Sequence, residues 1–356
     1  MRPADLGGRL AEWLDGTGPS SDVVLSSRVR LARNLGGIPF PNRADDGRLS
    51  STFDAVAAAV HSAKCLGRAA VWDLDELSAW DRRLLIERHL ATARLAEGRG
   101  RRGVCVAPGE RLGMMINEED HLRIQSVVSG FDLAAALRGA VELDLELETA
   151  LDYAVSPDRG YLTACPTNVG TGMRGSVLVH LPGLVLAGEI RKVHRAVAEM
   201  GMAVRGWFGE GSAALGDFHQ VSNQRKLGPT EEEIVEELGK VCRRILELEL
   251  EAREQLVTST SRRRRLEDRV HRSWAILRSA RLLTVESVMA CASDVRFGKW
   301  MGRFEAVPTE KLNRLALLTQ PAHLGRSEGR VLSGEEADWA RARLVRAEFA
   351  DFPVEG

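Results

Sequence analysis

Residues 161–181, YLTACPTNVGTGMRGSVLVHL, are the most informative stretch of the chain about its function. Cys165 stands directly before a proline, where the chain cannot easily be helical. Three glycines follow, and glycine lets a backbone bend tightly and approach a ligand closely. Arg174 offers a planar fork of donors that suits phosphate oxygens. The stretch therefore predicts a loop, followed by a strand, that handles phosphate and a second, polar substrate.

The composition is that of an ordinary soluble protein of one large or two smaller domains, with 356 residues, 44% hydrophobic and 28% charged. Lys+Arg 49 against Asp+Glu 50 leaves a net charge of -1, so no overall field recruits nucleic acid. The five cysteines are scattered and never spaced as CxxC, which argues against a disulfide framework or a zinc site. Neither a signal peptide nor a membrane-spanning stretch is recognisable. We expect a cytoplasmic protein with no membrane or nucleic-acid partner.

Periodicity divides the chain into two parts. Apolar residues at three- and four-residue spacing predict helices within 50–97, over 131–152 and from 230 to 257. The polar stretch TSTSRRRR then interrupts the pattern, and the remainder is mostly helical without further glycine-arginine loops. We therefore expect a catalytic domain over 1–257, an exposed linker over 258–265 and a helical domain over 266–356.

Three further motifs share the character of the first stretch: SSRVR at 26–30, NEEDHLR at 117–123 and RGWFGEG at 205–211. Phosphoryl transfer needs mainly positioning and neutralisation of charge, which arginines and a metal ion supply. No GxxxxGK[ST], HRD or DFG motif is present, which excludes P-loop and protein-kinase machinery. Carboxylates in the same segments suit a cationic acceptor. The arginines that could surround one triphosphate are Arg28, Arg30, Arg123, Arg174 and Arg205, and the glutamates are Glu118, Glu119 and Glu210.

The order and the amino-acid sequences of these segments resemble those of the phosphagen (guanidino) kinase superfamily. Its CPTN-x-GTG loop is intact as Cys165–Gly172 and its NEEDH strand as Asn117–His121, and the resemblance runs from about residue 21 to 257. It implies an α+β fold, with an antiparallel sheet flanked by helices and then a helical C-terminal domain. No room is left for a helical domain before SSRVR, whereas an extra helical region follows, as in the bacterial protein-arginine kinases. An open site of this kind faces an arginine carried by a polypeptide.

The resemblance also implies roles for single positions. Glu119 matches the catalytic carboxylate that accepts a guanidinium proton, Glu210 a second carboxylate on a mobile loop, and Cys165 the reactive cysteine beside the guanidinium. Mg²⁺ would be held mainly by ATP oxygens and water, so no protein metal ligands are expected. The positions that match the ATP site are Ser26, Ser27, Arg28, Val29, Arg30, His89, Arg123, Arg174, Gly175, Ser176, Val177, Leu178, Arg205, Gly206, Trp207, Phe208, Gly209 and Glu210.

The expected function is ATP-dependent phosphorylation of arginine side chains in proteins. The alternatives are a kinase for free arginine or another small guanidine, and a catalytically silent binding or adaptor protein. The family also implies a bacterial stress response, an activator protein and a Clp-type protease as partners.

Two features of the C-terminal region bear on regulation and assembly. Protein-arginine kinases carry an RDxxRA motif that binds phosphoarginine, and the aligned stretch here is ADWARA, in which Asp338 and Arg341 remain but Ala337 replaces the first arginine. The pocket is therefore doubtful, because charge-assisted contacts are the strong ones. The apolar residues Ile276, Leu277, Leu282 and Leu283 favour either a homodimer or packing within one chain.

Overall fold

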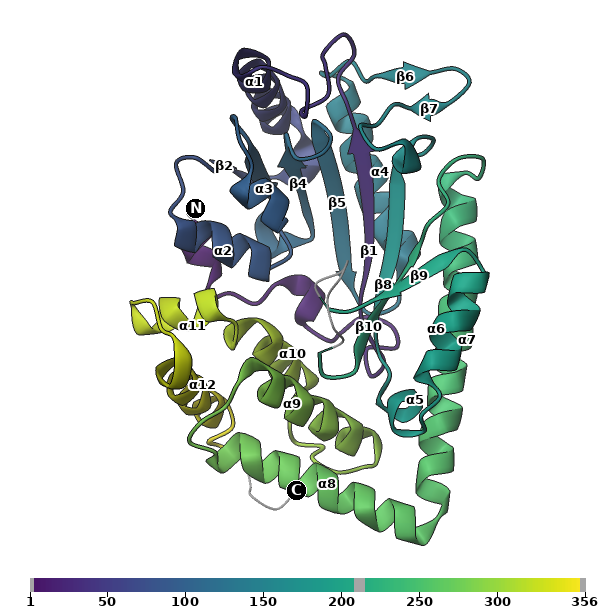
Figure 1. Cartoon of the computed structure of the whole chain (residues 1–356), viewed down its shortest axis with the longest axis vertical. Coiled ribbons are helices and arrows are strands. Elements are labelled where there is room, and N and C mark those ends of the chain that lie inside the picture. Colours follow the sequence, from purple (N-terminus) through teal and green to yellow (C-terminus); the bar gives the residue numbers. More distant parts are fainter. Residues whose placement is uncertain (1–2, 208–214, 353–356) are drawn as a thin grey trace.

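The protein is built on an eight-stranded antiparallel sheet with helices packed against it (Figure 1). The structure is a computed structural model that describes residues 3–207 and 215–352. The strand order is β2-β3-β4-β5-β1-β8-β10-β9, and a two-stranded hairpin, β6-β7, stands apart. This confirms the expected α+β class with an antiparallel sheet. The strands are β1 Val24–Arg33, β2 Ala70–Asp73, β3 Gly103–Val106, β4 Leu112–Ile116, β5 Leu122–Ser129, β6 Val155–Ser156, β7 Gly160–Tyr161, β8 Met173–His180, β9 Met202–Arg205 and β10 Phe218–Asn223.

Helices precede, cover and follow the sheet. The helices of the sheet region are α1 Asp46–Ser62, α2 Ala79–Glu87, α3 Ala93–Glu97, α4 Leu133–Glu148, α5 Pro182–Leu186, α6 Ile190–Glu199 and α7 Glu231–Thr258. The C-terminal helices are α8 Thr260–Ser279, α9 Val285–Trp300, α10 Thr309–Leu318, α11 Pro321–Glu328 and α12 Gly334–Glu348. None of the helices in the described residues is long and apolar enough to cross a bilayer.

The two faces of the sheet differ because residues alternate along β1. Val29 and Leu31 are fully buried and pack with Ala140 and Leu143 of α4 in one hydrophobic core. Each fully buried side chain of this size contributes about 1.5–3 kcal/mol to folding. Alternate residues on the same strand point to the other face. The apolar face thus fixes the strand's orientation, and the polar face is left for the site.

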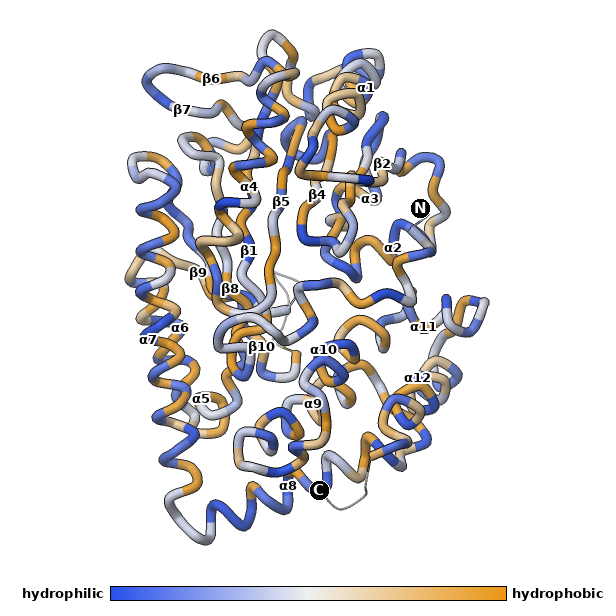
Figure 2. Tube along the Cα trace, turned by 180° about the vertical axis from the view of Figure 1, so that it is seen from behind, coloured by the Kyte–Doolittle hydropathy of each residue, from blue (hydrophilic) through white to orange (hydrophobic). Residues whose placement is uncertain are grey.

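The C-terminal helices form their own core and also pack against one end of the sheet. Trp274 and Phe297 lie in the C-terminal core. A separate cluster joins Trp207 and Phe218 of the sheet region to Met289 of α9 and Leu317 of α10. In Figure 2 α7 alternates orange and blue along its length, as expected for a helix with one buried stripe.

The polar stretch 258–265, which we expected to be a linker, is mostly helical. Residues 260–265 form the first turns of α8 and are exposed. The break between α7 and α8 is confined to Ser259, whose φ of -81° and ψ of 122° are extended. Figure 1 shows the corner that the chain makes between these two helices. Arginine has a high helix propensity, so a run of four arginines continues a helix rather than ending it. The polar composition of this segment therefore predicted its exposure correctly, but it did not indicate that the segment is helical.

Candidate active site

The arginines of the four motifs lie on one face of the sheet. Residues opposite each other in an antiparallel pair share a face, and so do residues two apart on one strand. Arg30 is directly opposite Arg174 on β8, and Arg28 is two residues away on the same strand. On the other side of β1, Arg123 of β5 is opposite the residue two positions after Arg30. The register carries the same face through β10 to Arg205.

This face forms a wall of a cavity of about 570 Å³. All five arginines line it, together with residues from α2 and the C-terminal domain. Two carboxylates of NEEDH also line it, and these residues form the turn between β4 and β5 rather than a strand. Its lining is Arg28, Arg30, Arg83, Ile86, Glu87, His89, Ala91, Thr92, Ala93, Arg94, Met115, Glu118, Glu119, Arg123, Arg174, Arg205, Gln220 and Gln320.

The positive charges of the arginine cluster repel one another and are only partly compensated by carboxylates. Burial and the nearby Arg123 lower the pKa of Arg28 to about 10. Burial and three neighbouring arginines lower the pKa of Arg30 well below its ordinary value. Within the described part of the chain, neither Arg28 nor Arg30 has a side-chain hydrogen bond or ion pair, and the Nε of Arg30 is buried without a partner. Like charges in this arrangement are stabilised when an anion binds between them.

The back of the NEEDH turn is anchored in the protein. The Oδ1 of Asp120 accepts hydrogen bonds from the Asn34 side chain at 2.6 Å and from the Ala164 backbone at 2.7 Å. The Nδ1 of His121 accepts one from the Leu35 backbone at 3.0 Å, and burial lowers the pKa of His121 to about 4. A neutral histidine can accept this bond. Asp120 and His121 therefore hold the turn in place.

The front of the turn presents two carboxylates to the cavity. Glu118 is engaged, because it accepts hydrogen bonds from Arg123 at 2.7 Å and from the Thr92 hydroxyl at 3.0 Å. Glu119 is paired more loosely, with Arg94 at 3.5 Å, and the Glu119 side chain is 26% exposed. Arg94 itself is mostly exposed. The arrangement leaves Glu119 the more accessible of the two carboxylates.

The cysteine loop lies next to the turn but does not line the cavity. The Sγ of Cys165 is 3.0 Å from the Thr167 hydroxyl, and the neighbouring Ala164 is bound to Asp120. Gly172 has a φ of +64°, and a Cβ there would lie 2.6 Å from the Ala32 carbonyl oxygen. Glycine is therefore required where the loop passes β1.

Lys226 binds the cysteine loop, a contact that sequence reasoning missed. It is only 8% exposed, and its Nζ donates to the Thr167 carbonyl at 3.2 Å and to the Asn168 side chain at 2.7 Å. Its own carbonyl accepts the Thr171 backbone N–H at 3.2 Å. Burial, followed by Arg174, lowers the pKa of Lys226 to about 8. The sequence offered one signal for this contact, which is a lysine three positions after the end of the buried strand β10.

His89 lies in a turn after α2, not within a helix as we expected, and its φ is +59°. Its ring is 5.8 Å from that of Trp13 and 6.0 Å from that of Trp207. Burial, followed by Arg28 and Arg30, lowers the pKa of His89 to about 3. His89 is therefore neutral beside the cationic cluster.

The remaining positions matched to the ATP site separate into four groups. Ser26, Ser176, Leu178 and Trp207 line a small cavity of about 30 Å³ that shares Arg28 and His89 with the larger one. The side chains of Ser27, Val29 and Val177 face the opposite side of the sheet, where Ser27 donates to the Gly130 carbonyl at 2.9 Å. Gly175 donates its N–H to the Asn223 side chain at 2.8 Å, and Gly206 is buried beside Trp207. Phe208, Gly209 and Glu210 lie outside the described residues.

The surviving residues of the ADWARA stretch are occupied by structural contacts. Arg341 is 4% exposed. Its Nε donates to the Thr319 carbonyl at 2.8 Å, and its guanidinium also binds the Leu283 carbonyl at 2.7 Å and Asp338 at 2.6 Å. These bonds hold α12 to its neighbours.

Comparisons with known proteins place the chain in a family. Residues 52–252 match ATP:guanido phosphotransferase, C-terminal catalytic domain, and residues 263–355 match Protein-arginine kinase McsB C-terminal domain. The chain belongs to the ATP:guanido phosphotransferase family, which confirms the superfamily expected from the motifs.

Relatives that are similar along nearly the whole chain are named protein-arginine kinases. The chain is 43% identical to the protein-arginine kinase of Pelotomaculum thermopropionicum over 97% of each chain. It is 40% identical to that of Bacillus subtilis over 95% of this chain and 93% of the relative.

Solved structures of the family share the fold. The duplicated taurocyamine kinase of Schistosoma mansoni has a TM-score of 0.60 and 25% identity over 65% of this chain, which spans 34% of the length of that protein. A lombricine kinase has a TM-score of 0.58 and 24% identity over 69% of this chain and 70% of its own.

Proposed function

We propose that the protein is an ATP-dependent protein-arginine kinase. The observation that carries this is the face of five arginines, two of them without a partner in the described residues, beside the accessible carboxylate of Glu119. The cationic face suits the triphosphate of ATP. Relatives named protein-arginine kinase, similar along nearly the whole chain, support an acceptor arginine in a protein.

The proposed step is in-line attack by a guanidinium nitrogen on the γ-phosphorus of ATP. The P–N bond forms as the bond from phosphorus to the bridging oxygen breaks, and ADP leaves. Because a guanidinium is almost never deprotonated in water, the attacking nitrogen must lose its proton during the step. We assign its acceptance to Glu119, with Cys165 beside the guanidinium and Glu210 as a second carboxylate.

Mg²⁺ is proposed to bind through the nucleotide. No cluster of three or more side chains that could hold a metal ion occurs within residues 3–207 and 215–352. Mg²⁺ takes few protein ligands in such sites and keeps phosphate oxygens and water. When bound, it supplies further neutralisation of the triphosphate.

The test is transfer of phosphate from Mg-ATP to a casein-like protein or to free arginine, with acid-labile phosphoarginine detected by mass spectrometry. We expect phosphoarginine on the protein substrate. Label on free arginine alone would instead indicate a kinase for a small guanidine. Absence of ATP turnover with any acceptor would indicate a binding protein that uses the same fold.

We also propose the domain limits and partners that the resemblance implied. The α7–α8 corner at Ser259 falls between the two family matches, which supports a catalytic domain over 1–257, a connection at 258–265 and a helical domain over 266–356. A cytoplasmic location, a role in stress response, an activator and a Clp-type protease belong to the same proposal.

A homodimer through the C-terminal domain is also proposed, but only two of the four apolar residues that suggested it are exposed. Leu277 and Leu283 are buried in the core of their own chain, whereas Ile276 is 41% and Leu282 50% exposed. Sedimentation velocity distinguishes a dimer from a monomer.

A further inference from the structure

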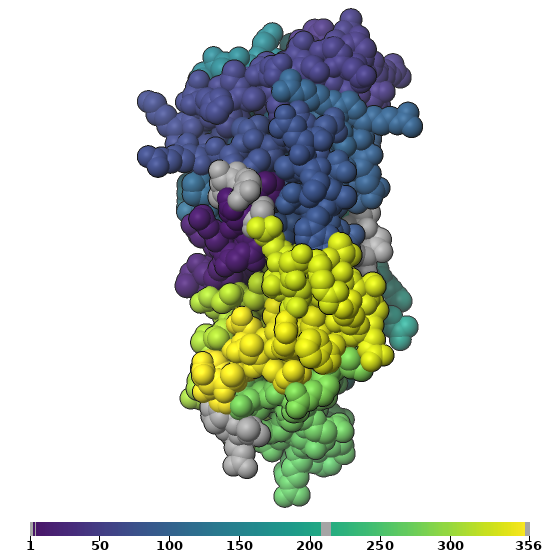
Figure 3. Space-filling model, turned by 90° about the vertical axis from the view of Figure 1, so that its left-hand side faces the viewer, coloured from purple at the N-terminus to yellow at the C-terminus, as the bar shows by residue number. Residues whose placement is uncertain are grey.

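Two elements that are far apart in the sequence meet beside the cavity. Arg83, Glu87 and His89, from α2 and the turn after it, line the cavity, and so does Gln320 from the C-terminal domain. Figure 3 shows C-terminal residues, in yellow, directly against the blue catalytic part. The wall of the cavity therefore continues from one domain into the other.

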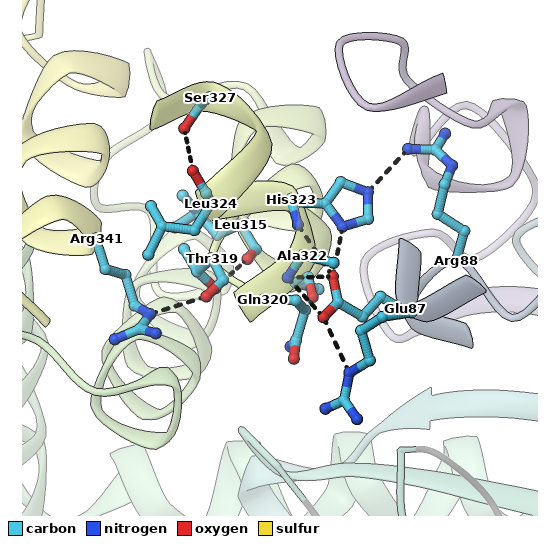
Figure 4. Close-up of polar contacts among 12 residues, drawn as sticks. Glu87, Arg88, Leu315, Thr319, Gln320, Ala322, His323, Leu324, Ser327 and Arg341 are labelled. Atoms are coloured by element: carbon cyan, nitrogen blue, oxygen red, sulfur yellow. Dashed lines mark hydrogen bonds and ion pairs between the residues drawn. The ribbon is translucent and has the colours of Figure 1, made fainter. Parts of the chain in front are cut away.

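The carboxylate of Glu87 supplies the N-terminal cap of α11. The N-cap residue Gln320 makes no side-chain cap, and Pro321 has no N–H to donate. The next two N–H groups, of Ala322 at 2.8 Å and His323 at 3.1 Å, both donate to Glu87, which is 2% exposed (Figure 4). A negative charge at this end of a helix is favourable. One domain thus completes a helix of the other.

His323 extends the contact to the next residue of the catalytic domain. Its Nε2 is 3.2 Å from an N–H of Arg88, and its Nδ1 is 2.9 Å from Glu87 (Figure 4). A guanidinium only donates, so Nε2 accepts and Nδ1 carries the proton that it donates to Glu87. Burial lowers the pKa of His323, in keeping with this neutral form. Arg88 also donates from its Nε to Glu110 at 2.9 Å.

The segment before α11 is held from its other side as well. Arg341 of α12 donates to the Thr319 carbonyl at 2.8 Å, and the Thr319 hydroxyl donates to Leu315 at 2.6 Å. The side chain of Gln320 donates to the Ala316 carbonyl at 3.0 Å. Thr319 and Gln320 are each at most 5% exposed. The part of the C-terminal domain that reaches the cavity is therefore rigidly placed.

We propose that the C-terminal domain contributes to nucleotide binding. Glu87 is the positioning residue that connects this domain to the nucleotide site. By capping α11, Glu87 fixes the end of α2, and with it His89, against the arginine face, and it keeps Gln320 at the cavity wall. The inference rests on the proposed function, because it assumes that the cavity binds the nucleotide.

The chain contains a matched control for Glu87. Glu249 is a fully buried carboxylate that caps α5, accepting the N–H groups of Gly183 at 2.8 Å and Leu184 at 2.9 Å after Pro182. It also pairs with Arg253 at 2.6 Å. Glu249 does not line the cavity. Substituting it therefore removes an equivalent cap without disturbing the site.

The experiment compares Glu87→Gln with Glu249→Gln by urea unfolding and by calorimetric titration with Mg-ADP. We expect both variants to unfold at lower urea concentrations than the wild type. Only Glu87→Gln should bind Mg-ADP more weakly, by about tenfold, the usual range for coupling between two sites. Equal affinity in the two variants would refute the positioning role.

Amide hydrogen exchange on the wild type tests the same coupling without a variant, should Glu87→Gln fail to fold. Coupling is reciprocal, so saturating Mg-ADP should slow exchange at Ala322 and His323. Unchanged exchange there, with slowed exchange in β1 and β8, would refute the inference. A wild type that binds Mg-ADP without phosphorylating arginine would refute the proposed function and leave this inference standing.

Discussion

Replacing Arg28 by methionine should stabilise the nucleotide-free protein. Burial and Arg123 lower the pKa of Arg28 from 12.5 to about 10, so the fold disfavours its charged form. A shift of this size corresponds to about 3 kcal/mol. Because the side chain is only partly buried, solvent screening reduces the gain to about 1–2 kcal/mol. Methionine keeps the apolar stem and removes the repelled charge.

The same substitution should weaken nucleotide binding. Loss of one charge-assisted hydrogen bond costs about 1.5–3 kcal/mol, which corresponds to about 10- to 100-fold in the dissociation constant of Mg-ATP. Stability and affinity should therefore change in opposite directions, as expected where a site holds like charges together for a ligand.

The assay is urea unfolding at pH 7 in low and high salt, with calorimetric titration of Mg-ATP. The matched control is Arg138→Met, an exposed position on α4 that should change stability by less than about 0.5 kcal/mol. High salt should reduce the stabilising effect of Arg28→Met, because repulsion between charges is screened. If Arg28→Met unfolds at a lower urea concentration than the wild type, the charge of Arg28 does not destabilise the fold and the reasoning is refuted.

Three further predictions concern the carboxylate turn, the thiol and the buried lysine. Glu119→Ala should abolish phosphoryl transfer while calorimetry still detects Mg-ATP binding, and strong residual transfer would show that the proton acceptor is assigned wrongly. Cys165→Ser should reduce the initial rate of transfer without changing the urea midpoint, whereas an unchanged rate would leave the thiol only a packing role. In the wild type Lys226 should contribute a rise in the free energy of unfolding between pH 8 and 10.5, because the unfolded chain holds the proton that the folded Lys226 gives up at a pKa of about 8. This rise opposes the fall above pH 9 that is expected from buried thiols such as Cys105 and Cys242, whose pKa burial raises to about 12. Lys226→Met should flatten that rise, and an identical pH profile in both proteins would contradict the low pKa.

Local signals accounted for the long helices. The sequence predicts helices over 131–152 and 230–257, and the structure has α4 and α7 at nearly these positions. The second begins sharply because Thr230 and Glu233 form a reciprocal capping box, a signal confined to four consecutive residues. The prediction of an exposed linker over 258–265 missed that residues 260–265 are helical, because polarity indicates exposure and an exposed arginine run is compatible with a helix.

Motifs of a few adjacent residues were enough to predict the family, the fold class and the segments that carry the arginines and carboxylates, because each of these is encoded in a short run of the chain. The folded chain was needed to show that Glu118 is hydrogen-bonded while Glu119 is more accessible, that Lys226 binds the cysteine loop, and that Glu87 caps a helix of the other domain. The physical reason is that a side chain's partners and burial depend on residues brought from distant parts of the chain by strand register and packing, which no local pattern encodes.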